Sequence, residues 1–459
     1  MSDTTSHSFE FIRDRNERGT HPASHSVKKK NTFEPYKKQN NNTQQDIFSI
    51  EPKGNQVTMS KVFIPIANVG KAHEADIYAV SVTNPYTVTC SGDGKIRLWS
   101  NKTLIQEQNR LKEIVLSQFV HQTGLHHIDV IYTVEPHDVG VVMIIATVSF
   151  SGNLHFYRFV EDTKEFIELD LLDSEMKKKS FWACKWVKSN DQVVDHRFIA
   201  TDVKGNTYVW RFLSVDKIVN EDETETKYEP NLHFDFQGEI PSNEPVFATC
   251  ISASSSKGLI ATGFANGTVI VSQLSTLRPL YTFEGIGREG IDENSNSVRS
   301  VEFSPAGNLL SVANDSGSYG CVTLYETEFG ERIGNLTVPT HSGQTNIGLF
   351  AHNGWVFNQA FNPSGEFIAT CGYDGKIRVW DIKSKERVST LHISATDIEI
   401  ESDILLTDEN GDSLKTPPVF DVTYIPQGTL NGVGNEANEG LCCVCMDRSI
   451  RWFREAGGK

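Results

Sequence analysis

The segment CGYDGKIRVWDIK at residues 371–383 recurs almost unchanged as CSGDGKIRLWSNK at residues 90–102. Asp-Gly between two apolar runs is a strong hairpin signal, so each copy predicts a strand, a tight turn and a second strand. Successive side chains of a strand point to opposite faces, which places Trp380 on the opposite face from Ile377 and Val379. Both faces of this unit are therefore expected to be buried, as they are in stacked sheets. The chain uses one strand-turn-strand unit more than once.

Each copy also carries the same four polar or aromatic residues at matching positions. A threonine precedes the turn aspartate by four residues, a tryptophan follows it by six, and a histidine lies well upstream. The two sets are His73, Thr89, Asp93 and Trp99, and His352, Thr370, Asp374 and Trp380. A hydroxyl can join a buried indole to an imidazole, and a carboxylate can accept the imidazole N–H. This pattern matches the WD repeat, a four-stranded propeller blade, and predicts two structural tetrads.

The ten-residue offset between the threonine and tryptophan positions reveals further units. It recurs from Thr147 to Tyr157, Ala200 to Trp210, Thr262 to Ser272 and Cys443 to Phe453, with Ser151, Lys204, Asn266 and Asp447 at the turn. A fifth unit at residues 309–325 requires a turn longer by several residues. The sequence therefore predicts an all-β fold, a seven-bladed WD-repeat β-propeller over residues 59–459.

Two features of the termini complete this prediction. Residues 1–58 are rich in Asn, Gln, Ser, Thr and Lys and lack periodicity, so we expect a disordered polar extension. The chain ends after a third strand at Phe453, while an unpaired strand precedes the first histidine at residues 62–66. We expect strand 62–66 to become the outer strand of the last blade, because this closes the ring and removes an open edge. Polar insertions at 220–231, 285–296 and the acidic segment 396–418 are expected to be surface spacers.

Composition and motifs exclude several classes of function. The net charge is −16, and residues 1–58 carry nine basic against seven acidic residues, so the body is acidic and a phosphate-binding surface is disfavoured. No membrane span, signal peptide, phosphate loop, dinucleotide fingerprint, HExxH or nucleophile elbow is present. Cys442, Cys443 and Cys445 lack a matching second pair, and His126 and His127 should point to opposite faces of a strand. We expect no catalytic residue, metal or cofactor.

The remaining candidate site is the narrow end of the ring. Strand phase places several side chains near the start of each innermost strand, above the central channel. They are Tyr78, Trp182, Phe247, Arg299, Trp355, Phe357, Tyr373 and Phe420, and the second blade cannot be phased. Aromatic residues grouped with an arginine are typical of a binding hot spot. The alternative is that some strands are misphased and these residues belong to the core.

Longer segments resemble one family more specifically. They include MSKVFI at Met59, LDLLDSEMKKKSFWACKW at Leu169, LYETEFGERIG at Leu324 and the terminal DRSIRWFREAGGK. These are similar to the WD-repeat subunit of the yeast superkiller complex, from about residue 59 to the end. The resemblance implies a scaffold that binds a tetratricopeptide subunit and, through it, an RNA helicase, in a complex that feeds cytoplasmic mRNA to the exosome for 3′-to-5′ decay and antiviral defence. It also implies a nuclear role beside the topoisomerase-like protein that cleaves DNA in meiotic recombination.

The sequence therefore predicts a non-catalytic interaction scaffold in the cytoplasm and nucleus, with no direct contact to nucleic acid or membrane. The Lys28–Lys30 run fits a nuclear address, although a solvated charge cluster is the commoner explanation. Two alternatives stay open. One is a generic WD-repeat adaptor of another complex, and the other is a propeller that binds nucleic acid.

Overall fold

The computed structural model describes residues 60–101, 114–135, 140–189, 196–222, 225–242, 245–284, 296–338, 350–398, 415–427 and 438–456. Residues 57–459 form one compact unit. The extension expected at 1–58 lies outside the described residues, so its predicted disorder stays a prediction.

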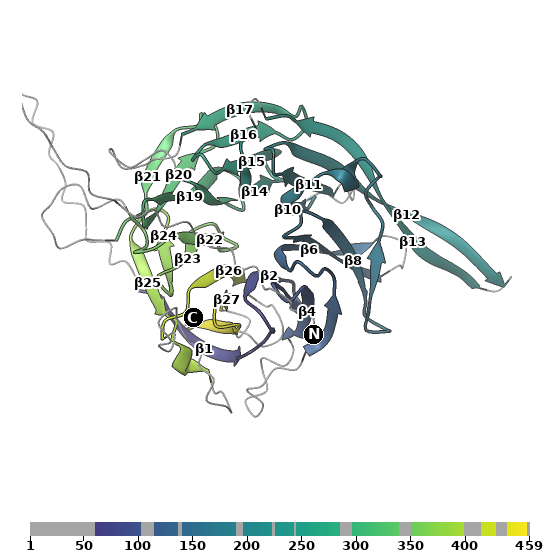
Figure 1. Ribbon diagram of the computed structural model, residues 1–459, viewed down its shortest axis with the longest axis horizontal. Helices are drawn as coiled ribbons and strands as arrows, with labels where there is room; N and C mark the ends of the chain where they lie inside the picture. Colours follow the sequence, from purple (N-terminus) through teal and green to yellow (C-terminus); the bar gives the residue numbers. More distant parts are fainter. Residues whose placement is uncertain are drawn as a thin grey trace, which may run out of the picture. The chain divides into compact units, whose positions relative to one another are not determined.

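Seven antiparallel four-stranded sheets are arranged as blades around a ring (Figure 1), which confirms the all-β seven-bladed propeller. From the innermost strand outward, blade 1 consists of β2 (Ile77–Val82), β3 (Tyr86–Ser91), β4 (Lys95–Ser100) and β5 (Ile114–Phe119); blade 2 of β6 (Leu125–Glu135), β7 (Gly140–Ser149), β8 (Leu154–Val160) and β9 (Glu165–Leu169); blade 3 of β10 (Phe181–Val187), β11 (Arg197–Asp202), β12 (Thr207–Asp222) and β13 (Glu225–Ile240); and blade 4 of β14 (Ala248–Ser254), β15 (Leu259–Phe264), β16 (Val269–Gln273) and β17 (Arg278–Phe283).

The remaining blades follow the same order. Blade 5 consists of β18 (Val298–Phe303), β19 (Leu309–Ser316), β20 (Tyr319–Glu326) and β21 (Arg332–Asn335); blade 6 of β22 (Val356–Phe361), β23 (Phe367–Gly372), β24 (Lys376–Asp381) and β25 (Arg387–His392); and blade 7 of β26 (Val419–Ile425), β27 (Gly440–Cys445), β28 (Ile450–Ala456) and β1 (Val62–Val69). In the described part of the chain, two short 3-10 turns, η2 (Met176–Lys178) and η4 (Ala395–Asp397), lie between blades. Among the described residues, no helix has the length and apolar character needed to cross a membrane.

The N-terminal strand completes the last blade. β1 runs antiparallel to β28, with Val62 opposite Ala456 and Val69 opposite Ile450, and Lys61 Nζ forms a 2.8 Å ion pair with Glu455. The innermost strands contact one another in order around the channel, and β2 of blade 1 also contacts β26 of blade 7. The ring is thus closed by two segments from opposite ends of the chain.

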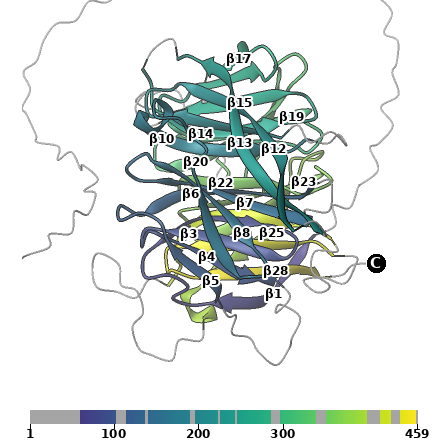
Figure 2. The same cartoon turned by 90° about the vertical axis from the view of Figure 1, so that its right-hand side faces the viewer.

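Apolar side chains fill the junctions between blades. Seven hydrophobic clusters occur, each built from two neighbouring blades. Trp380 packs in the cluster between blades 5 and 6, whereas Ile377 and Val379 pack between blades 6 and 7. This confirms that both faces of the repeated hairpin are buried, and Figure 2 shows the resulting stack of sheets from the side.

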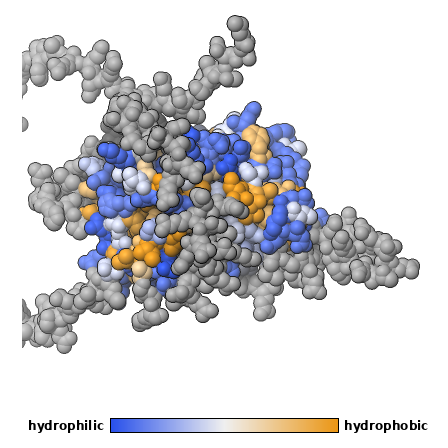
Figure 3. Space-filling view, turned by 90° about the horizontal axis from the view of Figure 1, so that it is seen from below, coloured by the Kyte–Doolittle hydropathy of each residue, from blue (hydrophilic) through white to orange (hydrophobic). Residues whose placement is uncertain are grey.

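The outer surface of the ring carries both apolar and polar side chains. Figure 3 views the molecule from the side on which β1 lies in Figure 1, and shows apolar surface in separate patches among hydrophilic surface. Several exposed apolar side chains belong to outermost strands, such as Ile114 and Phe119 of β5. Single apolar residues of this kind are ordinary on soluble proteins and carry no functional argument by themselves.

Three sequence-based expectations differ from the structure. The hairpin at 309–325 has a turn of only two residues, Gly317 and Ser318, because Ser316 pairs with Tyr319 and the additional residues lengthen β19 and β20 instead. The described part of 220–231 belongs to the long β12–β13 hairpin, which projects from the ring in Figure 1, and is not a loop. Ile398, Pro417 and Pro418 are buried, so both ends of the insertion 396–418 pack against the blades. The structure does not describe 285–295 or 399–414.

Candidate partner-binding face

The end of the ring at which the innermost strands begin carries one repeated backbone irregularity. In every blade the pairing register between the innermost strand and its neighbour shifts at the second residue of the innermost strand. A bulge of this kind re-aims its side chain away from the regular alternation of the strand. The seven bulge residues are Tyr78, His126, Trp182, Thr249, Arg299, Phe357 and Phe420. This end of the ring therefore presents one non-core side chain from each blade.

The side chains at this end form a nearly continuous chain of ring contacts, which we call the aromatic collar. It comprises Tyr78, His126, Phe150, Trp182, Phe247, Trp355, Phe357, Tyr373 and Phe420. Neighbouring ring centroids lie between 4.1 Å (His126 to Trp182) and 6.4 Å (Phe357 to Tyr373) apart. These separations are those of favourable aromatic pairs, so the rings support one another in fixed positions.

The collar is neither core nor fully solvated. Tyr373 is 56% exposed, and the other seven residues expected at this face are all partly buried. None of the eight is among the fully buried core residues. The structure therefore brings all eight to the same end of the ring, each at least partly exposed to solvent.

The two tetrads lie beside this face as closed hydrogen-bond networks. In blade 1, Trp99 Nε1 donates to Thr89 Oγ1 (3.0 Å), the His73 Nε2 atom lies 2.9 Å from the same hydroxyl, and His73 Nδ1 lies 3.0 Å from Asp93. In blade 6 the corresponding distances are 3.0, 2.8 and 2.9 Å for Trp380, Thr370, His352 and Asp374. Each network ties the loop before a blade to the hairpin within it.

Comparison with known proteins is consistent with this geometry. A model of the WD domain, G-beta repeat, matches residues 66–100 and 343–381. The chain is 55% identical over 406 residues to Antiviral protein SKI8 of Saccharomyces cerevisiae, covering 87% of this chain and 100% of that protein. The chain belongs to the SKI8 family of WD-repeat proteins. It is also 28% identical over 262 residues to Meiotic recombination protein rec14 of Schizosaccharomyces pombe, covering 57% of this chain and 69% of that protein.

The electrostatics of the tetrads in this SKI8-family chain are those of buried structural groups. Burial opposes ionisation of Asp93, but the hydrogen bond and charge of His73 and the backbone N–H groups of Glu74 and Lys95 together outweigh burial and lower the pKa of Asp93 to about 2. Burial also lowers the pKa of His73 and of His352, although their aspartates partly offset this effect. The side chains of His73 and Asp93 are 0% and 6% exposed, so a substrate has no access to them.

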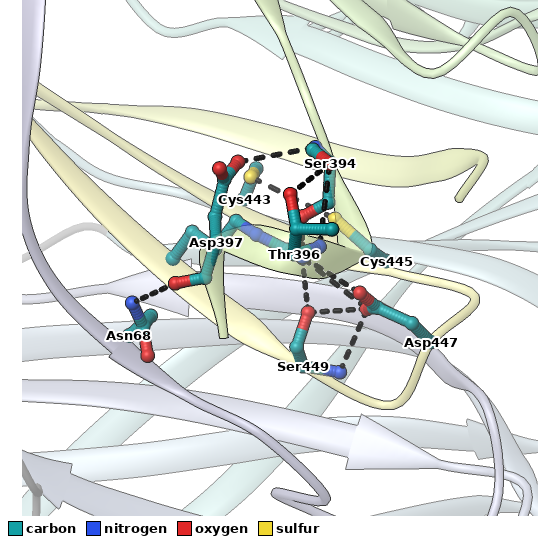
Figure 4. Close-up of polar contacts among 9 residues, drawn as sticks. Asn68, Ser394, Thr396, Asp397, Cys443, Cys445, Asp447 and Ser449 are labelled. Atoms are coloured by element: carbon teal, nitrogen blue, oxygen red, sulfur yellow. Dashed lines mark hydrogen bonds and ion pairs between the residues drawn. The ribbon is translucent and has the colours of Figure 1, made fainter. Parts of the chain in front are cut away.

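An arginine at the same strand position in blades 1, 6 and 7 was missed in the sequence. In blade 1 Arg97 donates to the Ala72 carbonyl, and in blade 6 Arg378 joins the tetrad itself. Arg378 Nη1 lies 2.8 Å from Asp374, and Arg97 and Arg451 occupy the same position in blades 1 and 7. The available signal was the repeated Ile-Arg pair after each Asp turn. In blade 7, where Cys443 replaces the threonine, Arg451 pairs with Asp447 at 2.6 Å and donates to the Ser394 carbonyl at 3.0 Å. Figure 4 shows Ser394, Cys443 and Asp447 at this position.

The same network anchors the start of the insertion that follows blade 6. Ser394 and Asp397 form a capping box around η4, and Asn68 of β1 donates to the Asp397 carbonyl at 3.0 Å (Figure 4). This turn therefore links blade 7, the closing strand β1 and the insertion.

Cys443 and Cys445 are free and buried, with Sγ atoms 3.9 Å apart.

The collar differs from the expected one in blades 2 and 4. His126 and Phe150 represent blade 2, and Phe150 precedes the turn position Ser151 just as Tyr373 precedes Asp374, so the ten-residue offset could have identified it. In blade 4 the bulge residue is Thr249, and Phe247 precedes it by two residues. In blade 4 the Ala265 N–H donates to the Phe247 carbonyl at 2.9 Å. In blade 6 the Tyr373 N–H donates to the Trp355 carbonyl at the same distance, so Phe247 is the counterpart of Trp355.

Arg299 is the charged member of this face, and its charge is compensated. Its guanidinium lies 2.8 Å from Asp315 and 4.6 Å from the centroid of the Trp355 ring. Burial raises the pKa of Asp315, and Arg299 partly offsets that rise. Arg299 therefore holds Trp355 by a cation–π contact and neutralises a buried carboxylate.

The two adjacent histidines lie in different environments. His126 stacks on Trp182 within the collar. Its pKa is lowered to about 3, mainly by burial and to a smaller extent by the charge of His127. His127 Nε2 lies 2.8 Å from the Cys184 carbonyl. Across the described ranges, no group of three or more His, Cys, Asp or Glu side chains is arranged to hold a metal ion.

Proposed function

We propose that this chain is a non-catalytic scaffold subunit of a superkiller-type complex and that the aromatic collar receives a short segment of a tetratricopeptide subunit, which also carries an RNA helicase. Such a complex would support exosome-mediated 3′-to-5′ decay of cytoplasmic mRNA and antiviral defence. The observation that carries the proposal is the collar itself. Partly exposed aromatic rings held in fixed positions on one face are the usual composition of a binding hot spot.

A second role uses the same face. The relative rec14 is named for meiotic recombination, and we propose that the collar also receives a topoisomerase-like DNA-cleaving protein in the nucleus. A scaffold that serves both partners would work in the cytoplasm and in the nucleus. Because both partners would need the same rings, their binding is expected to be mutually exclusive.

The residues also favour a scaffold over an enzyme or a nucleic-acid binder. The His, Thr and Asp groups that resemble a hydrolytic set are buried and engaged with tryptophan, and the acidic body disfavours phosphate groups. Purified protein is therefore expected to show no ATPase activity and only weak RNA binding. Sub-micromolar RNA affinity at physiological salt would favour the nucleic-acid-binding alternative.

The decisive experiment measures partner affinity in collar variants. Phe357→Ala and Trp182→Ala should each weaken binding of the purified tetratricopeptide subunit by about 2 kcal/mol or more, a change of roughly 30-fold in Kd. Tyr373→Ala is a further test because this side chain is more exposed and its removal disturbs the fold least. Phe119→Ala on the outer strand β5, where the side chain is 55% exposed, is the matched control and should leave Kd unchanged.

Thermal unfolding of the same variants separates binding from folding. Reduced affinity with a nearly unchanged Tm in Tyr373→Ala supports the proposal. Unchanged affinity in all three collar variants would contradict it. Loss of binding in proportion to loss of Tm would mean that these rings act as core residues.

A further inference from the structure

The opposite end of the ring carries an aromatic side chain in an unusual setting. Phe329, in the turn between β20 and β21, is 73% exposed, more than any other large apolar side chain that the structure describes as exposed. The turn belongs to the segment LYETEFGERIG, and the collar does not use it. An exposed phenylalanine alone would need no explanation, so the argument depends on how this one is held.

The turn is clamped by one carboxylate. Glu326 Oε1 and Oε2 accept hydrogen bonds from the backbone N–H groups of Glu328 (2.9 Å), Phe329 (2.9 Å) and Glu331 (2.8 Å). The Glu326 N–H in turn donates to the Glu331 carbonyl at 2.9 Å. These backbone hydrogen bonds lower the pKa of Glu326, so the clamp is ionised at neutral pH. The backbone around Phe329 is therefore fixed although its side chain is in solvent.

Two further contacts attach the turn to neighbouring structure. Tyr281 Oη of blade 4 donates to the Glu328 carbonyl at 2.5 Å, and Thr327 Oγ1 donates to the Gly307 carbonyl at 2.6 Å. Gly330 has φ of +76°, and a Cβ there would lie 2.8 Å from the Tyr281 ring. Only glycine fits this position without displacing the turn.

The turn lies at the end of the ring away from the collar. The collar is at the start of each innermost strand, and β20 runs in the same direction as β18, because both are antiparallel to β19. The turn after β20 is therefore at the far end, beside Gly307 in the turn after β18. A molecule that binds there would not compete for the collar.

We propose that the Phe329 turn is a second docking site, for a protein partner that offers an apolar pocket bordered by lysine or arginine. Phe329 inserts into the pocket, and the rigid turn reduces the ordering cost of binding. The negative charge of this turn indicates which residues should border the pocket of the partner. Glu328 and Glu331 are exposed on either side of Phe329, and with Glu326 and Arg332 the turn from 326 to 332 carries a net charge of −2. A basic rim would complement these carboxylates and exclude acidic partners.

The test uses the full chain in its native cell, with the photoreactive residue p-benzoylphenylalanine at one position. Replacement of Phe329 should yield a discrete cross-linked protein at least fivefold more efficiently than replacement of the control Phe119, and the linked peptide should contain lysine or arginine. The double variant Glu328→Lys/Glu331→Lys should reduce this cross-link at least fivefold. Glu326→Ala, which keeps the aromatic position but releases the clamp, should also reduce it.

The collar variant Phe357→Ala distinguishes this site from the first. Cross-linking at 329 should persist in Phe357→Ala, and Phe329→Ser should leave the Tm and the affinity of the collar for its partner unchanged. A cross-link at 329 no stronger than at 119, one insensitive to charge reversal, or one to a second copy of this chain would overturn the proposal. Loss of the cross-link in Phe357→Ala would assign the turn to the collar partner instead of a separate one.

Discussion

The backbone N–H of Val80 on β2 donates a 2.8 Å hydrogen bond to Asp421 Oδ2 on β26, joining the innermost strands of the first and last blades. Asn358 Nδ2 of blade 6 donates to the other carboxylate oxygen. Asp421 thus connects three blades at the channel wall. Burial raises its pKa to about 7, and the hydrogen bonds from Val80 and Asn358 offset only part of that rise.

This shift predicts a pH dependence of stability. Below about pH 4 the carboxyl is protonated in both states, and between about pH 4 and 7 only the folded state keeps the proton, so stability falls as pH rises through this window. For Asp421 alone the slope is at most about 1.4 kcal/mol per pH unit. Asp421→Asn should lose this contribution, measured as the difference between variant and wild type in urea unfolding at several pH values. Asp170→Asn on the surface is the control, and an unaltered slope in Asp421→Asn would refute the assignment.

Ring closure predicts different outcomes for two truncations. Deletion of 1–58 leaves β1 intact and should not change the Tm. Deletion of 1–69 removes β1, exposes the edge of β28 and uncovers apolar side chains packed against Phe63 and Ile66. We expect a loss of about 2–3 kcal/mol from these two partly buried side chains, together with aggregation. Thermal unfolding and light scattering check this, and equal Tm values for the two proteins would contradict it.

The tetrad of blade 6 predicts a large effect at its aspartate. Asp374→Ala would leave His352 and Arg378 buried without their acceptor, at a cost of about 3–5 kcal/mol in unfolding free energy. Lys204→Ala is the matched control, because Lys204 occupies the same turn position in blade 3, is exposed and should be nearly neutral. Wild-type stability of Asp374→Ala in urea unfolding would show that the network is dispensable.

The Arg299–Asp315 pair predicts coupling between stability and binding. Arg299→Leu alone leaves the Asp315 carboxylate, 5% exposed, without its cation, and should cost about 3 kcal/mol or more. Asp315→Asn in the same chain should restore most of that stability. Partner affinity should stay reduced in the double variant, since Trp355 has lost its cation–π contact. Recovery of both stability and partner affinity in the double variant would mean that Arg299 contributes only to the stability of the fold.

The sequence predicted the architecture well because the residues that define a WD repeat lie close together along the chain. Asp-Gly turns, the ten-residue offset and the tetrad residues are separated by short, regular distances, and these were sufficient for seven blades. Blade 2, in which Ser151 and Tyr157 replace the turn aspartate and the tryptophan, was not phased from the sequence. The hairpin at 309–325 was misjudged because sequence length does not say whether additional residues extend a turn or its strands.

The sequence by itself determined which hairpins repeat, which residues could form buried polar networks and that aromatic residues gather near the starts of innermost strands. Only the tertiary structure decided how those aromatics meet. In blade 4 the bulge position is occupied by Thr249, and Phe247, two residues earlier, takes the position that Trp355 has in blade 6, which the apolar pattern of the sequence did not distinguish. The contact of Arg299 with Trp355 and the support of the Phe329 turn by Tyr281 were likewise decided by the fold. Asp315 meets Arg299 within blade 5, where β19 lies beside β18, but Trp355 reaches Arg299 only when blade 6 packs beside blade 5. Tyr281 supports the Phe329 turn only across the junction of blades 4 and 5.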